Sequence, residues 1–380
     1  MSSDKFIHAS HVGSLPRSME LAQVLIAKDH GEPVDAGDFD NMVTQEIGDA
    51  LRHQVESGIS IASDGELGKV GYSTYMTERL SGFGDAHIAR KPALDLAEHP
   101  DFAKKLAAIM GSQEFVRAAC VDKVKLVNLD PLHDDIRRFK AAMASLDKPV
   151  QGFMNSASPG LITAFQPNKY YPTHEAYLAD LVDAMKAEYE AIVDAGFYLQ
   201  LDCPDLAMSR HTGYQDVSDA EFLKIAAANV EAINAATANI PAEKMRMHIC
   251  WGNYEGPHDH DIPLENVIDT ILKAKPATIL FEGANPRHEH EWTVWRDAAI
   301  PDDKILAPGL IDTCSNYVEH PELIAQRLQR FIDIVGLERV VACTDCGFGT
   351  FAGYGKIDPG VTWKKLKALR EGADIAAARN

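Results

Sequence analysis

Two kinds of segment alternate along the chain. Short runs rich in apolar and β-branched residues are followed by stretches in which apolar residues recur three and four positions apart, as in an amphipathic helix. The eight short runs are Phe6–Leu15, Gly58–Leu67, Pro149–Ser158, Phe197–Leu206, Lys244–Trp251, Ala277–Gly283, Lys304–Asp312 and Arg339–Gly347. Ala176–Ala195 and Pro321–Ile334 have clear helical spacing. Ser218 and Glu221 have the spacing of a capping box, which predicts that a helix begins there.

This alternation predicts an α/β fold with parallel strands and right-handed crossovers. Eight strand–helix units fit a closed (β/α)8 TIM barrel, and an open doubly wound sheet is the alternative. The stretch 82–147 is too long for one crossover, so we interpret it as an inserted segment after the second strand. Within it we expect helices near Phe102–Met110 and Asp134–Ala144 and an extended piece near Ala119–Val127. The expected organisation is a single domain over residues 1–380.

Composition narrows the class of protein. No segment approaches the run of about 18 apolar residues that a membrane span needs, and the N-terminus lacks a signal-like apolar region, which predicts a cytoplasmic protein. Acidic residues outnumber basic ones by 56 to 37, and the net charge of −19 argues against nucleic-acid or anionic-membrane partners. Six cysteines without a signal do not indicate a disulfide framework. Association into a homo-oligomer is left open.

Candidate metal ligands follow the predicted strands. In an α/β barrel the chemistry lies at the carboxyl ends of the strands. His248 and Cys250 are two positions apart, so they project to one face of a strand end. Glu282 ends the sixth run and Cys346 ends the eighth. Zinc takes four ligands of these types in a tetrahedral arrangement, so the placement of these four residues predicts a zinc site.

Each of these signals is weak when taken alone. A His-x-Cys pair on a strand is commonly packed in a core, and Glu282 alone fits a solvated or ion-paired carboxylate. Cys343 and Cys346 form a C-x-x-C, which elsewhere marks redox or zinc sites, but we interpret Cys343 as a core residue. The pairs His258–His260 and His288–His290 are interpreted as polar loop residues rather than a second metal site.

Seven short segments, spread in order along nearly the whole chain, match the motifs of one family. They are His11–Pro16, Asp64–Glu66, Gln200–Pro204, His248–Cys250, Glu282, Gly309–Asp312 and Asp345–Gly347. With these segments the chain resembles the cobalamin-independent methionine synthase family, specifically its C-terminal catalytic barrel. The resemblance implies the TIM-barrel fold and methyl transfer to homocysteine, giving methionine.

The resemblance also implies roles for individual residues. It makes Zn2+ the cofactor, with four ligands: His248, Cys250, Glu282 and Cys346. It implies that Gly13 and Ser14 hold the homocysteine carboxylate. It implies that Glu66 and Asp202 hold the amino group.

The sequence departs from the family pattern in places that concern the methyl donor. The family's catalytic histidine lies in an Asp-x-His segment, which here reads Asp312-Thr313-Cys314. Full-length members also carry a second, N-terminal half of similar size. Asp312 and Cys314 are therefore the candidates for proton transfer, with Tyr72 or Tyr75 as substitutes. These changes put a folate donor in doubt, although the metal and thiol residues are intact.

The predicted ligands favour thiol activation over hydrolysis. A zinc ion with two cysteinates and one carboxylate carries a net charge of about −1, which makes it a poor activator of water. Such a centre lowers the pKa of an incoming thiol from about 8.5 yet leaves the zinc-bound thiolate nucleophilic. The thiolate then attacks an electrophilic carbon in an SN2 step, with the substrate held in place for the reaction.

Three functions remain open on this basis. The first is a zinc-dependent thiol alkyltransferase, with homocysteine as substrate because Glu66 and Asp202 suit an ammonium group. The second is addition of a thiol to an epoxide, as in the single-barrel epoxyalkane–coenzyme M transferases, with Arg17 as the candidate contact for the sulfonate. The third is a non-catalytic zinc- or thiol-binding protein. The partners are thus a small thiol and an alkyl donor whose identity the sequence does not give.

Overall fold

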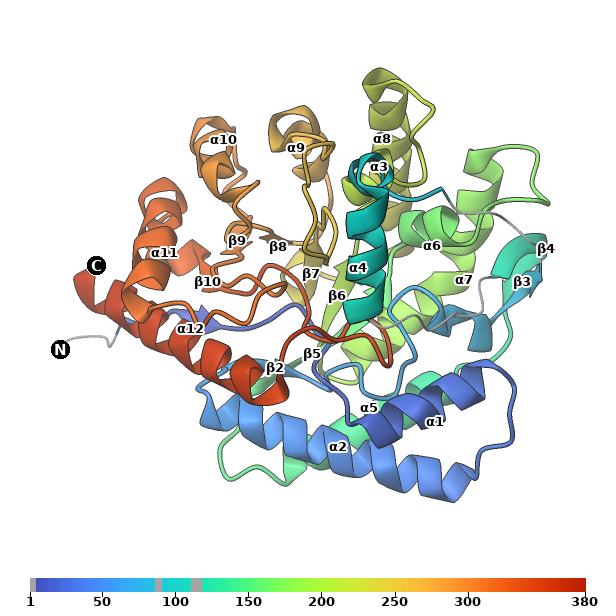
Figure 1. Cartoon of the computed structure of the whole chain (residues 1–380), viewed down its shortest axis with the longest axis horizontal. Helices are drawn as coiled ribbons and strands as arrows, with labels where there is room; N and C mark the ends of the chain where they lie inside the picture. The colour runs from blue at the N-terminus through green and yellow to red at the C-terminus, as the bar shows by residue number, and fades with distance from the viewer. Residues whose placement is uncertain (1–4, 86–90, 111–117) are drawn as a thin grey trace.

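Six parallel strands form the central sheet of the computed structural model, which describes residues 5–85, 91–110 and 118–380 (Figure 1). In their spatial order, the strands are β2 (Ile61–Ser63), β5 (Gln151–Ala157), β6 (Tyr198–Asp202), β7 (Met245–His248), β8 (Thr278–Phe281) and β9 (Ile305–Pro308). Their order in space follows their order in the chain. The connections are therefore crossovers between neighbours, as the alternating pattern predicts.

Two further strands continue this sheet on both sides. β1 (His8–Ala9) pairs in parallel with β10 (Val341–Ala342). Isolated parallel bridges join Ser10 to Ile61, which begins β2, and join Leu306 of β9 to Val340. Each of the eight predicted runs thus contributes a short parallel strand, and the predicted α/β class is confirmed.

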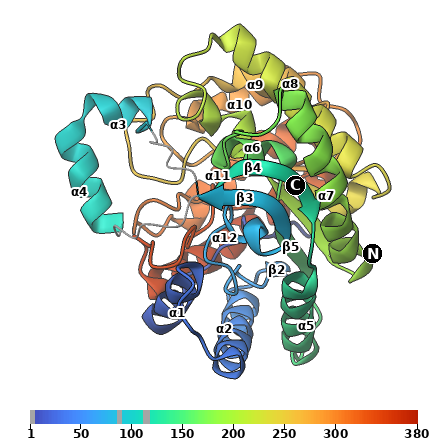
Figure 2. The same ribbon diagram turned by 90° about the vertical axis from the view of Figure 1, so that its right-hand side faces the viewer.

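Helices cover the outer side of the strands, as the two views show (Figures 1 and 2). Their bounds are α1 Met19–Asp29, α2 Ala36–Glu56, α5 Asp130–Ala144, α6 Pro159–Phe165, α7 His174–Asp194, α8 Asp219–Ala236, α9 Leu264–Ile271, α10 Trp292–Asp297, α11 Pro321–Val335 and α12 Pro359–Arg379. The capping box predicted at α8 is present, since Ser218 and Glu221 satisfy each other's backbone N–H groups. None of the helices in the described ranges has the length and apolar character needed to cross a membrane.

The stretch between β2 and β5 contains more than one crossover helix. β3 (Leu80–Asp85) and β4 (Ala118–Leu126) form an antiparallel pair, and α3 (Leu94–Glu98) and α4 (Pro100–Met110) lie between them in the chain. α3 and α4 project to one side of the molecule (Figure 2). The helices and the extended piece expected here are confirmed, while 86–90 and 111–117 of the predicted insertion lie outside the described residues.

A buried arginine joins the first strand segment to the middle of the sheet. Arg246 of β7 donates to the Ser10 hydroxyl (2.9 Å) and the His11 carbonyl (3.0 Å), and its guanidinium lies 4.0 Å from the centre of the Phe153 ring. Burial lowers the pKa of Arg246 to about 10, which still leaves it charged at neutral pH. These contacts hold the β1 segment against strands that are far from it in sheet order.

Candidate metal and thiol site

Three of the four predicted metal ligands meet at the carboxyl ends of β7 and β10. His248 ends β7, Cys250 follows two residues later, and Cys346 lies four residues after β10. The Cys250 and Cys346 sulfur atoms are 3.9 Å apart. A ring nitrogen of His248 and the two sulfurs all lie within 4.8 Å of one another, and all three residues are buried. The His-x-Cys pair therefore belongs to a group with the size and chemistry of a metal site.

Glu282 lies next to this group but is engaged by hydrogen bonds. It directly follows β8, and one of its carboxylate oxygens accepts a hydrogen bond from the backbone N–H of Trp251 (2.8 Å). Its other oxygen accepts from the Asn285 side chain (3.0 Å). Its charge acts on both thiols, since it contributes to raising the pKa of Cys250 and of Cys346. Each oxygen accepts one hydrogen bond, so the carboxylate keeps lone pairs with which it could ligate a metal.

The environment of the two thiols is anionic. The hydrogen-bonded neighbour Cys346 raises the pKa of Cys250 well above its usual range, and burial adds to the effect. Burial also raises the pKa of Asp345 to about 8, and the charge of Glu282 adds to this shift. Two adjacent buried thiols can both ionise only when a cation offsets their charge. The group therefore has the chemistry of a site for a soft cation.

Two acidic residues approach the same cavity from another direction. Asp202 ends β6 and accepts two contacts from the Asn155 amide, at 3.1 and 3.2 Å. Glu66 is buried, and one of its carboxylate oxygens has no hydrogen-bond partner. Burial raises the pKa of Glu66 to about 8, with Lys69 opposing the shift and Asp202 adding to it. An unpartnered buried carboxylate beside a second acid is suited to a cationic group of a ligand.

The segment of Gly13 and Ser14 closes this end of the cavity. Ser14 lines the cavity, and its hydroxyl accepts from the Gly349 N–H at 3.4 Å. Gly13 has a φ of 148°, and a Cβ there would lie 2.4 Å from an Asn155 oxygen, so a side chain does not fit. Gly13 thus permits the close approach of two loops, while Ser14 offers the polar group.

Arg17, the candidate contact for an anion, makes hydrogen bonds to the main chain. Its guanidinium donates to the carbonyls of Gly349, Glu66 and Lys69, the latter two at 2.7 and 3.0 Å. It is absent from the described residues that line the cavity. The contact of Arg17 with a substrate anion therefore stays a prediction. Its two terminal guanidinium nitrogens donate to main-chain acceptors and link its own segment to the loop of Glu66 and to Gly349, while its buried Nε has no hydrogen-bond partner among the described residues.

Asp312 and Cys314 are absent from the described lining of the large cavity. The Asp312 carboxylate accepts from the Cys314 backbone N–H (2.8 Å), and the Cys314 thiol donates to the side-chain amide oxygen of Asn253 (3.3 Å). Cys314 lines a small neighbouring cavity of about 20 Å³, which shares Asn253 with the large one. Burial raises the pKa of Cys314 well above its usual range. Their proposed part in proton transfer stays a prediction.

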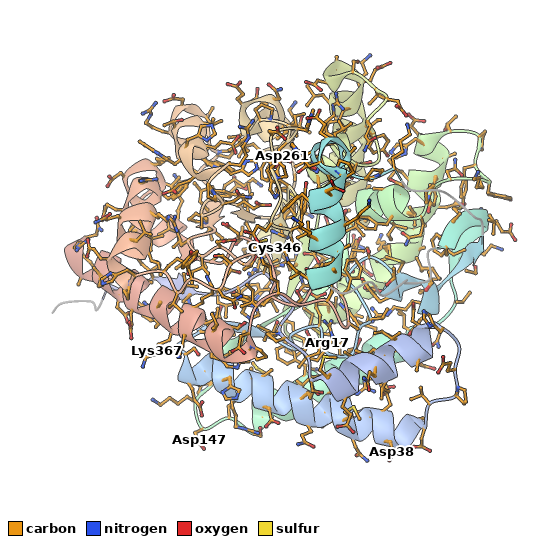
Figure 3. The ribbon with its side chains drawn as sticks, viewed as in Figure 1. Arg17, Asp38, Asp147, Asp261, Cys346 and Lys367 are labelled. Carbon is orange, nitrogen blue, oxygen red and sulfur yellow. The ribbon has the colours of Figure 1, made fainter. Side chains whose placement is uncertain are left out.

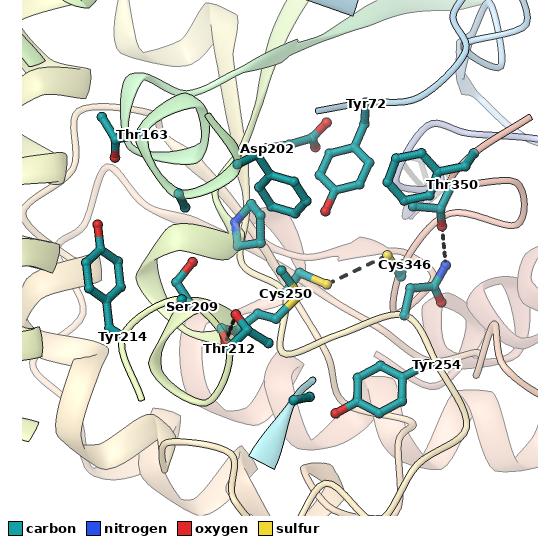
Figure 4. A pocket seen from close by; sticks show the side chains of 18 of the residues that line it. Tyr72, Thr163, Asp202, Ser209, Thr212, Tyr214, Cys250, Tyr254, Cys346 and Thr350 are labelled. Atoms are coloured by element: carbon teal, nitrogen blue, oxygen red, sulfur yellow. Dashed lines mark hydrogen bonds between the residues drawn. The ribbon is translucent and has the colours of Figure 1, made fainter. Parts of the chain in front are cut away.

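A cavity of about 940 Å³ connects the metal-type group to the acids. Figure 4 shows the thiols of Cys250 and Cys346 facing each other, with Asp202 and Tyr72 on one side and Tyr254 on the other. Tyr72, which was a candidate from the sequence, lines the cavity together with three residues that were not: Phe165, Phe351 and Tyr354. These three come from loops and a helix end that show no periodic signal, so nothing in the sequence pattern marks them.

A second group of ligand-type residues was also missed as a cluster. Asp261 accepts from His258 (2.7 Å) and from His288 (2.9 Å), and the other ring nitrogen of His288 contacts Glu291 (2.8 Å). Burial alone would lower the pKa values of these histidines, but the hydrogen bonds to Asp261 outweigh it and raise them to about 9 for His258 and about 10 for His288. The cluster is buried and absent from the described lining of the cavity.

The fold and this geometry define an α/β protein with a His-Cys-Cys group at the carboxyl ends of its parallel strands. Residues 129–358, more than half of the chain, match the family described as the cobalamin-independent synthase catalytic domain. The chain therefore belongs to this family.

Relatives align over most of the chain. A methionine synthase of Thermococcus kodakarensis is 25% identical over 370 residues, which cover 96% of this chain and 92% of that protein. The uncharacterized protein YxjH of Bacillus subtilis is 25% identical over 367 residues, covering 94% and 92%. A B12-independent methionine synthase from Shewanella sp. W3-18-1, solved with selenomethionine, superposes with a TM-score of 0.72 at 19% identity and covers 98% of both chains. This last likeness shows the fold alone.

Proposed function

We propose that this protein is a zinc-dependent S-methyltransferase that methylates homocysteine to methionine. One observation carries the proposal: a single cavity joins the His248–Cys250–Cys346 group to the acids Glu66 and Asp202. A small thiol with an ammonium group at its other end matches both. The family membership and the relatives named methionine synthase agree with this activity.

The residues present fit a zinc ion. His248, Cys250 and Cys346 already lie within 4.8 Å of one another, and Glu282 is the fourth candidate ligand. When bound, zinc would offset the charge of the thiolates and lower the pKa of the substrate thiol. The hydrogen bonds from Trp251 and Asn285 hold the Glu282 carboxylate in place, so its exchange with an incoming thiol would leave a satisfied carboxylate behind.

The rest of the cavity orients the thiol. Glu66 and Asp202 receive the ammonium group, whose charge offsets the cost of ionising two neighbouring buried acids. The Ser14 hydroxyl, which lines the cavity, would donate to the carboxylate. Holding both ends of the substrate fixes the sulfur in an orientation for attack. This lowers the entropic contribution to the activation free energy.

Coenzyme M is the less favoured thiol. Its sulfonate needs a cationic or N–H donor, and Arg17 already donates to three main-chain carbonyls. It also has no ammonium group to occupy the space between Glu66 and Asp202. A non-catalytic thiol-binding protein would use the same residues, so turnover assays must separate that possibility.

We also infer that the eight strands form one closed (β/α)8 barrel in a single domain over 1–380, with the stretch at about 82–147 inserted after the second strand. The β1–β10 pair and the bridges from Ser10 to Ile61 and from Leu306 to Val340 support closure. Arg246, which joins β7 to the β1 segment, supports it from inside.

Zinc-edge X-ray absorption with and without homocysteine tests the function directly. The expected result is one zinc with about two sulfur neighbours, rising to about three when homocysteine is added. Two sulfurs that stay unchanged would redirect the proposal to another thiol, with coenzyme M tested next. Protein purified without chelators that holds no zinc would overturn the proposal.

A further inference from the structure

Four aromatic side chains line the cavity on one side: Tyr72, Phe165, Phe351 and Tyr354, here called the aromatic wall. The Tyr72 ring centre lies 5.6 Å from that of Phe165 and 5.4 Å from that of Phe351, and Phe351 lies 5.9 Å from Tyr354. All four are partly exposed, which is expected for rings that face a cavity. Figure 4 shows Tyr72 on the same side of the thiol pair as Asp202.

The backbone is shaped to hold this wall together. Gly71 and Phe351 form an isolated antiparallel bridge. A Cβ at Gly71 would lie 2.3 Å from the Phe351 ring, so only glycine lets the loop after β2 lie directly against that ring. Asn253 donates to the Gly347 carbonyl (2.8 Å) and the Thr350 hydroxyl (2.7 Å), which fixes the loop that carries Phe351.

The described lining of the cavity is acidic. It contains the acids Glu66, Asp202 and Asp216. Among the same described residues, Lys91 is the one lysine and no arginine occurs, and Lys91 is paired with Asp216 at 2.5 Å. Such a cavity disfavours a polyanionic carrier and favours a cation, because like charges repel and opposite charges attract across a site of low dielectric.

The position of the family's histidine supplies no acid to the cavity. Cys314 occupies that position, and its thiol points to Asn253 and lines the small neighbouring cavity. Asp312 accepts from the Cys314 backbone and is absent from the described lining of the large cavity. A donor whose leaving group must be protonated is therefore poorly served by these two residues.

We propose that the methyl donor is a methylated onium cation, a sulfonium or a quaternary ammonium, whose charged head lies against the aromatic wall. The proposal rests on the proposed methyl transfer to homocysteine and names the donor class for that site. Aromatic faces attract such cations through their quadrupole, and the attraction grows in a desolvated site. An onium donor also leaves as a neutral group, so it does not depend on Asp312 or Cys314 as an acid.

The step balances without a further reactant. The homocysteine thiol loses its proton to solvent when the thiolate forms. The thiolate sulfur then attacks the methyl carbon, and a sulfur–carbon bond forms as the bond from carbon to the onium atom breaks. The electron pair of the broken bond goes to the leaving sulfur or nitrogen, which becomes a neutral thioether or tertiary amine and needs no proton. The products are methionine, the demethylated donor and the proton released at the start.

Binding is tested by calorimetric titration of the zinc-loaded protein with choline and with 3,3-dimethylbutan-1-ol, its neutral isostere. We expect choline to bind and the isostere to bind on the order of tenfold more weakly or not at all. Phe351→Leu should weaken choline binding by a similar factor, while Phe351→Tyr should preserve it. Phe102→Leu is the matched control, since Phe102 is exposed on α4 and absent from the described cavity lining. Equal binding of the two probes would overturn the proposal.

Turnover separates this inference from the function on which it rests. Homocysteine is offered dimethylsulfonioacetate, betaine or 5-methyltetrahydrofolate as donor, and methionine is measured. Methionine from the sulfonium or from betaine supports the proposal and identifies which onium atom is used. Methionine from the folate alone would overturn the onium donor and keep the methyltransferase. No methionine from any donor would overturn both.

Discussion

Two buried groups of ligand-type side chains lie in the interior of the molecule, where Figure 3 labels Cys346 of one and Asp261 of the other. In each group the potential ligand atoms lie within 4.8 Å of one another. The His248–Cys250–Cys346 group borders the large cavity, whereas the His258–Asp261–His288 cluster is enclosed and uses both ring nitrogens of each histidine in hydrogen bonds. Proximity of ligand-type residues is thus insufficient to define a site. Contact with the cavity distinguishes the first group from the second.

The largest expected effect concerns the first group. Cys346→Ala removes one of two adjacent thiols and should abolish zinc binding and methionine formation, a loss on the order of a thousandfold or more. Metal analysis and a methionine assay measure it. Cys343→Ala is the matched control, because Cys343 is a buried core residue of the same C-x-x-C. Full activity in the Cys346 variant would contradict the assignment.

A stability effect is expected from the second group. Asp261→Ala leaves two buried imidazolium groups without their shared carboxylate, which should lower the free energy of unfolding by about 3–5 kcal/mol. Denaturant unfolding of zinc-loaded protein measures it. Zinc content should stay at the wild-type value, because Asp261 belongs to the enclosed cluster. Loss of zinc from a variant that is still folded would show that the two groups are not separate.

A substitution in the acid pair, Glu66 and Asp202, should weaken homocysteine binding more than it weakens zinc binding. Glu66→Gln removes a charged partner of the proposed ammonium group, so KM for homocysteine should rise by about 10- to 100-fold with a smaller change in kcat. Glu46→Gln serves as control, since Glu46 bonds to Ser18 away from the cavity. An unchanged KM would exclude Glu66 from substrate binding.

The most gradual effect is on the pH dependence of stability. The folded-state pKa of His258 is raised to about 9 and that of His288 to about 10, against an ordinary value of 6.5. A raised pKa contributes stability that is fully present below about pH 6.5 and is lost as pH rises through the folded-state values. The free energy of unfolding should therefore fall between pH 6.5 and about 10. His258→Gln should flatten this decline, and an unchanged slope would contradict it.

The sequence pattern was sufficient for the strands and for the metal-type group because both follow simple rules. A strand end fixes where the next side chains point, so His248 and Cys250 had to share a face and lie at the end where parallel strands present their chemistry. Arg17 shows the limit of this reasoning. Its closeness in sequence to Ser14 suggested a ligand contact, but its guanidinium reaches main-chain carbonyls of segments more than forty residues away.

The family, the order of the strands and the residue types of the metal group follow from the amino-acid sequence, because local spacing and strand periodicity encode them. Only the tertiary structure brings together the members of the aromatic wall and of the His258–Asp261–His288 cluster. Their members come from loops and helix ends separated by up to 282 residues, between Tyr72 and Tyr354, and no local period relates such positions. Long-range packing alone brings those rings and charges together, and it also decides which buried group borders the cavity and which is enclosed.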